Sequence, residues 1–221
     1  MEIIKLENVS KSYLDASKKL NVLKEINLSV QEGEFVAITG ASGCGKSTLL
    51  HLIGLLDTAD SGAILLAGEA SDSISNMEIF RNKNIGFIFQ FHYLLEDFTA
   101  LENVAIPLLV QGYKRKEAYN IASESIKSLG LEERLNHFPN QLSGGEEQRI
   151  AIARAIVTNP KILIADEPSG NLDDETTKLV MTILRNLNKK GLTVIFVTHD
   201  LSLVSDHDTH YTIKDGKLTN V

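Results

Sequence analysis

Residues 40–48 read Gly40-Ala41-Ser42-Gly43-Cys44-Gly45-Lys46-Ser47-Thr48 and directly follow the apolar run at 35–39. Gly40 and Gly45 have four residues between them and are followed by Lys46-Ser47, which is the spacing of a phosphate-binding loop. Glycine lets backbone N–H groups approach phosphate oxygens, and a helix that begins near Lys46 would point its positive end at the same anion. The Lys46 ammonium would reach the outer phosphates. A glycine turn that only caps a helix is the alternative, but the strand before it and the helix after it favour phosphate binding.

Three more short apolar runs, at 85–89, 162–165 and 193–198, are rich in β-branched residues and predict strands. Because their apolarity is continuous rather than alternating, we expect them to be buried on both faces. Helical spacing of apolar residues lies between them, in Ala118, Ile121, Ala122, Ile126 and Leu129 and again in Leu179, Val180, Ile183, Leu184 and Leu187. This alternation of strands and helices predicts an α/β fold with a mainly parallel core sheet.

Two segments depart from that alternation. Apolar and polar residues alternate at 26–30, before a turn signal at 31–34, which predicts a small N-terminal antiparallel sheet. From 91 to about 158 strand signals vanish and helices dominate, with breaks expected at Pro107, Gly112, Gly130 and Pro139. We therefore expect one domain over 1–221, with a core lobe at about 1–90 and 159–221 and an inserted helical lobe at about 91–158.

The composition excludes several classes of protein. Apolar residues make up 43% of the 221 residues, enough for a core, and the net charge is −7 with Lys and Arg dispersed, so we expect no nucleic-acid partner. No apolar stretch approaches the roughly 18 residues of a spanning helix, and the first residues lack a secretory pattern, so we expect a soluble protein of the cytoplasm. A single cysteine, Cys44, excludes an internal disulfide.

Polar residues follow the other three core runs, at the strand ends where open α/β sheets bind ligands. Asp166 could hold the coordination shell of Mg²⁺, and the Ser47 hydroxyl could bind the same ion. Glu167 could orient or deprotonate an attacking water. Gln90 offers an amide oxygen to Mg²⁺ or water, and His199 could hydrogen-bond a γ-phosphate. Each residue alone is more often structural, but four polar sites after four buried runs favour one nucleotide site.

The segment at 142–149 reads Leu142-Ser143-Gly144-Gly145-Glu146-Glu147-Gln148-Arg149, and its Ser143 to Glu146 spacing is that of a capping box. Together with 40–48, Gln90, 162–167 and His199, it resembles the ordered motif set of ABC transporter ATPases across nearly the whole chain. The resemblance implies a P-loop NTPase fold of ABC type that hydrolyses ATP with Mg²⁺. It also implies a sandwich dimer, in which the γ-phosphate held by one subunit meets a second subunit's Ser143, Gly144 and Gly145, with Glu146 beside them.

Two further segments gain a role from this resemblance. Tyr13 falls where ABC ATPases stack adenine on an aromatic ring, although a tyrosine after a strand is usually a packing residue. The segment Ser169-Gly170-Asn171-Leu172-Asp173 resembles the loop that couples the two ATP sites. Asp173 could also cap the next helix, and both roles are compatible.

The stretch after Gln90 reads Phe91-His92-Tyr93-Leu94-Leu95-Glu96-Asp97-Phe98-Thr99-Ala100-Leu101-Glu102-Asn103-Val104. In ABC ATPases this region meets the coupling helix of the membrane subunit. It is most similar to ATPases of lipoprotein-releasing systems, a group that includes macrolide-exporter and cell-division ATPases. This implies transmembrane permease partners, a homodimer with ATP bound, and a peripheral place on the cytoplasmic side of the inner membrane.

Two departures bear on the cargo, because Tyr93 and Glu96 stand where histidine and proline are common in that group. A macrolide-type exporter and an ATP-gated cell-division scaffold remain the alternatives. The other reading of the stretch is internal packing, in which at least two of four residues would belong to the core of the helical lobe, namely Phe91, Leu94, Leu95 and Phe98.

Overall fold

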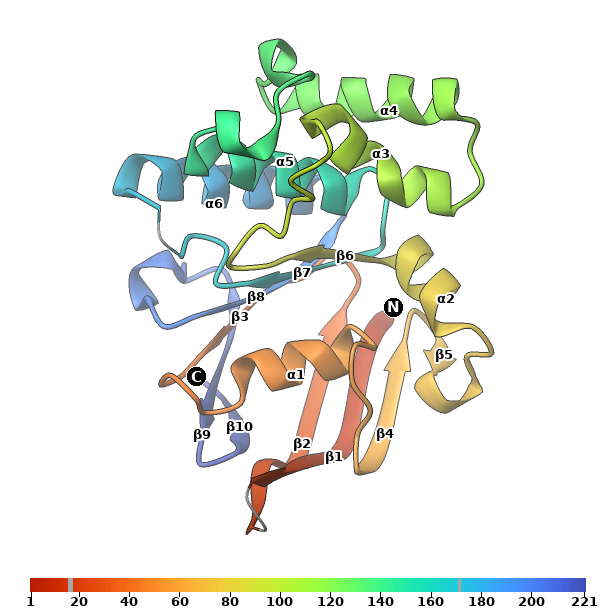
Figure 1. Ribbon diagram of the computed structural model, residues 1–221. Helices are drawn as coiled ribbons and strands as arrows, with labels where there is room; N and C mark the ends of the chain where they lie inside the picture. Colours follow the sequence, from red (N-terminus) through yellow and green to blue (C-terminus); the bar gives the residue numbers. More distant parts are fainter. Residues whose placement is uncertain (16–17, 171) are drawn as a thin grey trace. The chain divides into compact units, whose positions relative to one another are not determined.

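The structure, a computed structural model, describes residues 1–15, 18–170 and 172–221 (Figure 1). Its residues form two compact units, one made of Met1–Met77 with Leu187–Val221 and one made of Glu78–Asn186. The lobe boundaries expected from the sequence, near 91 and 158, stay a prediction.

The first unit begins with an antiparallel sheet. Strand β1 (Glu2–Asp15) pairs with β2 (Lys18–Gln31) and with β4 (Ser61–Leu66), and β5 (Glu69–Ala70) extends the sheet in the order β2-β1-β4-β5. Ile26, Leu28 and Val30 of β2 are buried, as their alternation with polar residues requires. The expected N-terminal antiparallel sheet is confirmed.

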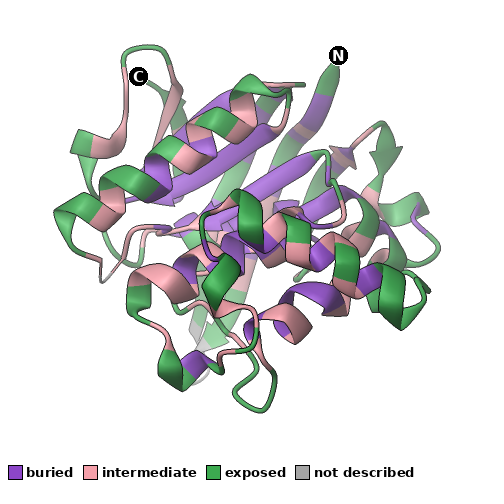
Figure 2. Ribbon diagram, turned by 90° about the horizontal axis from the view of Figure 1, so that it is seen from above, coloured by how far each residue is buried: buried purple, intermediate pink, exposed green. Residues whose placement is uncertain are grey.

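The same unit holds strands of the mainly parallel sheet. Strand β3 (Phe35–Thr39) lies between β8 (Thr193–Thr198) and β9 (Thr209–Lys214), parallel to both, and β10 (Lys217–Asn220) pairs antiparallel with β9. All residues of β3 and β8 are buried, which is visible as purple strands in Figure 2. Helix α1 (Lys46–Ile53) follows β3 and contacts β2, and two 3₁₀ turns complete the unit, η1 (Ser71–Ser73) and η4 (Leu201–Leu203).

In the second unit, β6 (Ile85–Ile88) and β7 (Ile162–Asp166) pair in parallel. Its helices are α2 (Met77–Asn84), α3 (Ala100–Val110), α4 (Arg115–Ser128), α5 (Gly144–Ile156) and most of α6 (Asp174–Lys189), with 3₁₀ turns η2 (Glu132–Arg134) and η3 (Pro139–Gln141). Helices α3, α4 and α5 pack on one another (Figure 1) around a core of buried residues: Ala100, Val104, Ala105, Leu108, Ala118, Ala122, Ile126, Leu131, Ile150, Ala153 and Val157.

Two expectations about the helices are wrong. Pro107 does not break a helix but lies inside α3, although it has no N–H to donate to the preceding turn. The helix continues past it, and the Pro107 carbonyl accepts from the Gln111 N–H at 3.2 Å and from the Asn82 amide at 3.2 Å. Leu179 of α6 is exposed, since the buried face of that helix is centred on Val180, Met181 and Leu184.

Candidate functional site

The phosphate-binding loop is shaped by its glycines. Gly45 immediately precedes α1 with φ +106°. Gly40 has φ +151°, and a Cβ there would lie 2.6 Å from the Ile213 carbonyl oxygen and 2.7 Å from the Cys44 sulfur. A larger residue at position 40 would therefore displace the loop from β9, so glycine is required where the backbone is expected to surround phosphate.

Lys46 lies in the loop with its side chain buried, at 8% exposure. Its ammonium donates to the Gly40 and Ala41 carbonyls, at 2.9 and 3.1 Å, so it is held over the start of the loop. The Ser47 residue in the first turn of α1 is exposed. A left-handed loop, a fixed cation, a helix N-terminus and an accessible hydroxyl fit a triphosphate with its Mg²⁺.

Tyr13 lies near the end of β1 with 38% of its surface exposed. Its phenol donates to Asp57 Oδ2 at 2.6 Å, and the Lys11 ammonium lies 5.0 Å from the centre of its ring. Burial raises the pKa of the Tyr13 phenol, and the hydrogen bond to Asp57 raises it further. The sequence analysis singled out Tyr13 for base stacking, which stays a prediction, and did not indicate its contacts with Lys11 and Asp57.

His199 directly follows β8 and is exposed. The turn that carries it is fixed by two hydrogen bonds, from the Asp200 N–H to Thr198 Oγ1 at 3.0 Å and from the Ser202 N–H to Asp200 Oδ1 at 2.9 Å. The hydrogen bonds from Ser202 lower the pKa of the Asp200 carboxyl. The first unit thus carries Tyr13, residues 40–48 and His199.

The second unit carries the acidic pair. Asp166 is the last residue of β7, and Glu167 follows it with φ +46°, a left-handed conformation that a non-glycine residue rarely adopts, least of all before a proline, here Pro168. The Gly170 N–H donates to the Glu167 carbonyl at 2.8 Å and closes this turn. A strained backbone of this kind persists only where the surrounding structure holds it, and such positions cluster at active sites.

Gln90 lies next to this turn in the same unit. A Cβ on Gly170 would lie 3.0 Å from Gln90 Cγ and 3.2 Å from its amide nitrogen. The structure therefore brings together the loops that follow β6 and β7, as expected from the parallel pairing of these strands. Strand β6 itself ends at Ile88, one residue before the expected end.

Ser143 is the N-cap of α5, and the predicted capping box is confirmed. Glu146 donates its N–H to the Ser143 hydroxyl at 3.4 Å, while the Glu146 carboxylate accepts from the Ser143 N–H at 2.8 Å and from its hydroxyl at 2.9 Å. Arg134 donates to the same carboxylate at 2.7 Å. The Ser143 N–H and Arg134 lower the pKa of Glu146 to about 2.

Helix α5 is joined to the loop after Glu167. The buried Gln148 amide donates to the Pro168 carbonyl at 2.5 Å, and a Cβ on Gly145 would lie 2.7 Å from a methyl group of Thr176. Thr176 donates its N–H to Asp173 Oδ1 at 2.9 Å, which confirms Asp173 as a cap of α6. Asn171, part of the same predicted loop, lies outside the described residues.

The capping box predicts a pH-dependent stability. Ionised Glu146 has a lowered pKa, so its contribution is complete above the usual carboxyl pKa and is lost as the pH falls toward about 2. We expect Glu146→Gln to reduce the free energy of unfolding at neutral pH by about 1–2 kcal/mol, less than the full shift implies because solvent screens the pair. The difference between the two proteins should shrink between about pH 5 and pH 2 in denaturant titrations.

Glu133→Gln is the matched control, because the Glu133 side chain is 91% exposed beside the same arginine. It should leave stability unchanged at every pH. A Glu146→Gln deficit of equal size at pH 7 and pH 3 would show that the ionised carboxylate does not provide this stability.

The loop at 91–98 is attached to α5 while its large side chains face outward. The Arg154 guanidinium donates to the His92 and Tyr93 carbonyls at 2.6 and 2.7 Å, and His92 Nδ1 lies 3.1 Å from a Glu147 carboxylate oxygen. Exposed fractions are 58% for Phe91, 62% for Tyr93, 47% for Leu95 and 41% for Phe98.

Among the four residues proposed for internal packing, Leu94 alone joins the helical core. The expectation that at least two of the four would do so is wrong. No local pattern indicated a role for Arg154, which lies 61 residues from Tyr93 in the chain.

Known proteins match this arrangement over nearly its full length. The ABC transporter family matches residues 23–170. The lipoprotein-releasing system ATP-binding protein LolD of Pseudoalteromonas translucida (strain TAC 125) is 47% identical over 220 residues, covering 98% of this chain and 95% of that protein. The uncharacterized ABC transporter ATP-binding protein MJ1508 of Methanocaldococcus jannaschii is 46% identical over 225 residues, covering 99% of each.

Two solved structures also match. A dimeric structure of MJ0796, a bacterial ABC transporter cassette, has a TM-score of 0.90 at 41% identity, covering 98% of this chain and 96% of that one. A dimeric post-hydrolysis state of MJ0796 bound to ADP and Pi has a TM-score of 0.91 at 39% identity, covering 99% and 98%. The chain therefore belongs to the ABC transporter family. It is an α/β P-loop ATPase, the ATP-binding subunit of an ABC transporter.

Proposed function

We propose that the chain powers the release of lipoproteins from the inner membrane by hydrolysing ATP beneath partner permeases. The observation that carries this proposal is the identity of 45–47% to LolD proteins over at least 98% of this chain. MJ1508 is equally similar, and its name specifies no cargo.

Residues 40–48 would hold the phosphates of ATP, and Tyr13 would stack on its base. Mg²⁺ would be held by Ser47, Gln90 and Asp166, and when bound it would neutralise phosphate charge. The glycine geometry of the loop supports phosphate binding. The places of Asp166, the last residue of β7, and of Gln90, two residues after β6, support their role as Mg²⁺ ligands.

Glu167 would act as the base that orients or deprotonates the attacking water, and His199 would hydrogen-bond the γ-phosphate. The left-handed backbone of Glu167 supports its role, because a strained residue at a strand end is costly to retain without function.

Two copies of the chain would close around ATP, with Ser143, Gly144 and Gly145 of one copy meeting the γ-phosphate held by the other. The exposed N-terminus of α5 supports this, since Ser143 and Gly144 are exposed at the positive end of a helix. The MJ0796 structures are dimeric, which supports the same arrangement.

The permease would dock on the exposed side chains of the loop at 91–98. Arg154 and Glu147 join this loop to α5, whose first turn contains the residues proposed to meet ATP. Movement of the partner would therefore be transmitted along one helix to the nucleotide. No helix in the described part of the chain has the length and apolarity to cross a membrane. We place the chain peripherally on the cytoplasmic side of the inner membrane through this docking.

Affinity purification of the chain from its native membranes, followed by mass spectrometry, tests the cargo. We expect permeases with a large extracytoplasmic domain and attached lipoprotein. A cell-division scaffold or a macrolide-type exporter in their place would keep the ATPase and contradict lipoprotein release.

The docking surface is tested in the same experiment with the double variant Phe91→Ala/Phe98→Ala. It should lose the permeases but keep its ATP affinity, because both side chains are exposed and belong to no core. Leu14→Ala is the matched control, since Leu14 is 83% exposed on β1 in the other unit. Retention of the permeases by the double variant would contradict this surface.

A further inference from the structure

The loop at 57–60, between α1 and β4, is fastened to the end of β1 that carries Tyr13. Asp57 Oδ1 accepts from the Lys11 ammonium at 2.7 Å, and Asp57 Oδ2 accepts from the Tyr13 phenol at 2.6 Å. Asp60 accepts from the Ser12 N–H at 2.9 Å and from its hydroxyl, and the Asp60 N–H donates to the Ser10 carbonyl at 2.9 Å. Asp57 thus binds Lys11 and Tyr13, and Asp60 binds Ser10 and Ser12. Together the two acidic residues contact four consecutive residues of β1.

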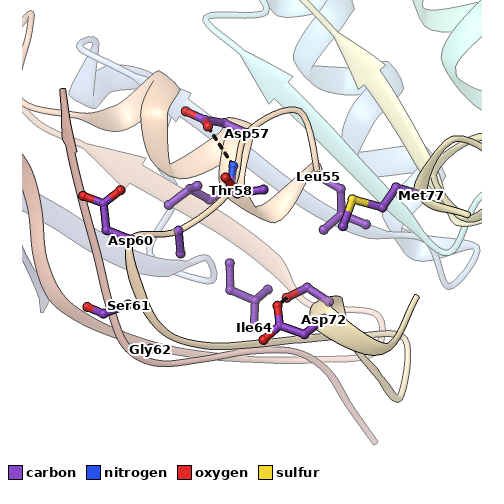
Figure 3. A pocket seen from close by; sticks show the side chains of 12 residues that line it. Leu55, Asp57, Thr58, Asp60, Ser61, Gly62, Ile64, Asp72 and Met77 are labelled. Atoms are coloured by element: carbon purple, nitrogen blue, oxygen red, sulfur yellow. Dashed lines mark hydrogen bonds between the residues drawn. The ribbon is translucent and has the colours of Figure 1, made fainter. Parts of the chain in front are cut away.

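Hydrogen bonds with Thr58 and with helix α1 also fix the position of Asp57. Figure 3 shows Asp57, Thr58 and Asp60 along the loop that borders a hollow of about 200 Å³, with the hydrogen bond from the Thr58 N–H to Asp57 Oδ1 at 2.7 Å. The Asp57 N–H in turn donates to the His51 carbonyl of α1 at 3.3 Å. Asp57 is therefore tied to the helix that begins at the phosphate-binding loop.

Lys11 is a buried cation whose charge is balanced by the Asp57 carboxylate. It is 8% exposed, and besides Asp57 its ammonium donates to the Thr58 carbonyl at 2.7 Å. Burial alone would raise the pKa of Asp57, but hydrogen bonds from Lys11, Tyr13 and the Thr58 N–H outweigh it and hold that pKa below its usual value. The carboxylate stays ionised and keeps both partners in place.

These contacts occupy one face of the Tyr13 ring and hold its hydroxyl. The Lys11 ammonium lies over the ring, 5.0 Å from its centre, so a base would have to stack on the opposite face. The residue as a whole is 38% exposed. The phenol donates to the Asp57 carboxylate, and Asp57 is itself bound through its N–H to the His51 carbonyl of α1. The ring is thus anchored to the phosphate-binding helix instead of rotating freely.

We propose that Asp57 is a positioning residue for nucleotide binding, which together with Lys11 fixes the Tyr13 ring as the surface on which the purine base of ATP stacks. This rests on the proposed binding of ATP to residues 40–48. Because a prepositioned ring loses less conformational entropy on stacking, Asp57 should strengthen the binding of ATP and leave the binding of bare phosphates unchanged.

The test compares the dissociation constants of ATP and inorganic tripolyphosphate, each with Mg²⁺, by calorimetry on the full chain. Asp57→Asn removes the carboxylate charge. Tyr13→Phe keeps the ring and the Lys11–Asp57 ion pair and removes only the hydroxyl, so it tests the Tyr13–Asp57 hydrogen bond without leaving the buried Lys11 unpaired. We expect both variants to weaken ATP about three- to tenfold and tripolyphosphate less than twofold. Asp72→Asn, at an exposed carboxylate bordering the same hollow, should change neither.

Equal weakening of both ligands would overturn the proposal, because Asp57 would then act on the phosphate loop or on folding. Unchanged ATP affinity in both variants would overturn it as well. Tyr13→Ala separates the two levels of the argument: we expect about a tenfold loss of ATP affinity alone. If Tyr13→Ala binds ATP like the wild type, base stacking fails; if the wild type binds neither ligand, the proposed ATP site itself fails.

Discussion

Glu167→Gln is expected to lower the rate of ATP hydrolysis about 100-fold or more, the usual contribution of a general base. Glutamine has nearly the same shape and fits the same left-handed turn after β7, but its amide cannot accept the proton of the attacking water. ATP binding does not need that proton transfer. The variant should therefore bind ATP and remain as a closed dimer, which light scattering detects as a doubled mass in the presence of ATP.

The control is Glu175→Gln, which changes an exposed glutamate in the first turn of α6 in the same unit. It should hydrolyse ATP at the wild-type rate. A Glu167→Gln protein that turns over as fast as the wild type would refute Glu167 as the base.

Lys46→Ala should abolish hydrolysis, with a loss of about 1000-fold, because it removes the fixed positive charge from the phosphate loop. Unlike Glu167→Gln, it should also weaken ATP binding and yield no dimer. The ammonium donates to the Gly40 and Ala41 carbonyls, so the loop itself loses two hydrogen bonds. The thermal unfolding midpoint, measured alongside the phosphate-release rate, reports whether the fold survives this loss.

Lys190→Ala, at an exposed lysine after α6, is the matched control and should keep full activity. Substantial ATPase activity in a folded Lys46→Ala protein would overturn the assignment of residues 40–48.

Features encoded in consecutive residues were predictable. Continuous apolar runs gave the bounds of β3 and β8, because strands buried on both faces leave no polar residues inside. The alternation around Ile26, Leu28 and Val30 predicted the antiparallel sheet but not that β1 and β2 each extend over 14 residues. Pro107 misled because α3 continues past it while packing on α4 and α5, and no local pattern reveals that packing.

The candidate site divides in the same way. The phosphate loop, the capping box and the Asp173 cap follow from local spacing, and the structure shows the latter two directly. The contacts that hold the other residues join distant positions: 44 residues separate Tyr13 from Asp57, 20 separate Gln148 from Pro168, and 62 separate Arg154 from His92. Only the fold places such pairs together, so a single sequence contains no signal for them.

In the proposed dimer two copies of the chain share each ATP, so neither copy alone holds a complete site. The most direct measurement is the rate of phosphate release by the wild-type chain with saturating Mg²⁺ and ATP, followed over a range of protein concentrations at which light scattering reports mainly monomers. The expected rate rises more steeply than the protein concentration, because in the proposed dimer Ser143, Gly144 and Gly145 come from a second copy. A rate strictly proportional to concentration in that range would show that one copy holds a complete site, and would refute the shared-site dimer.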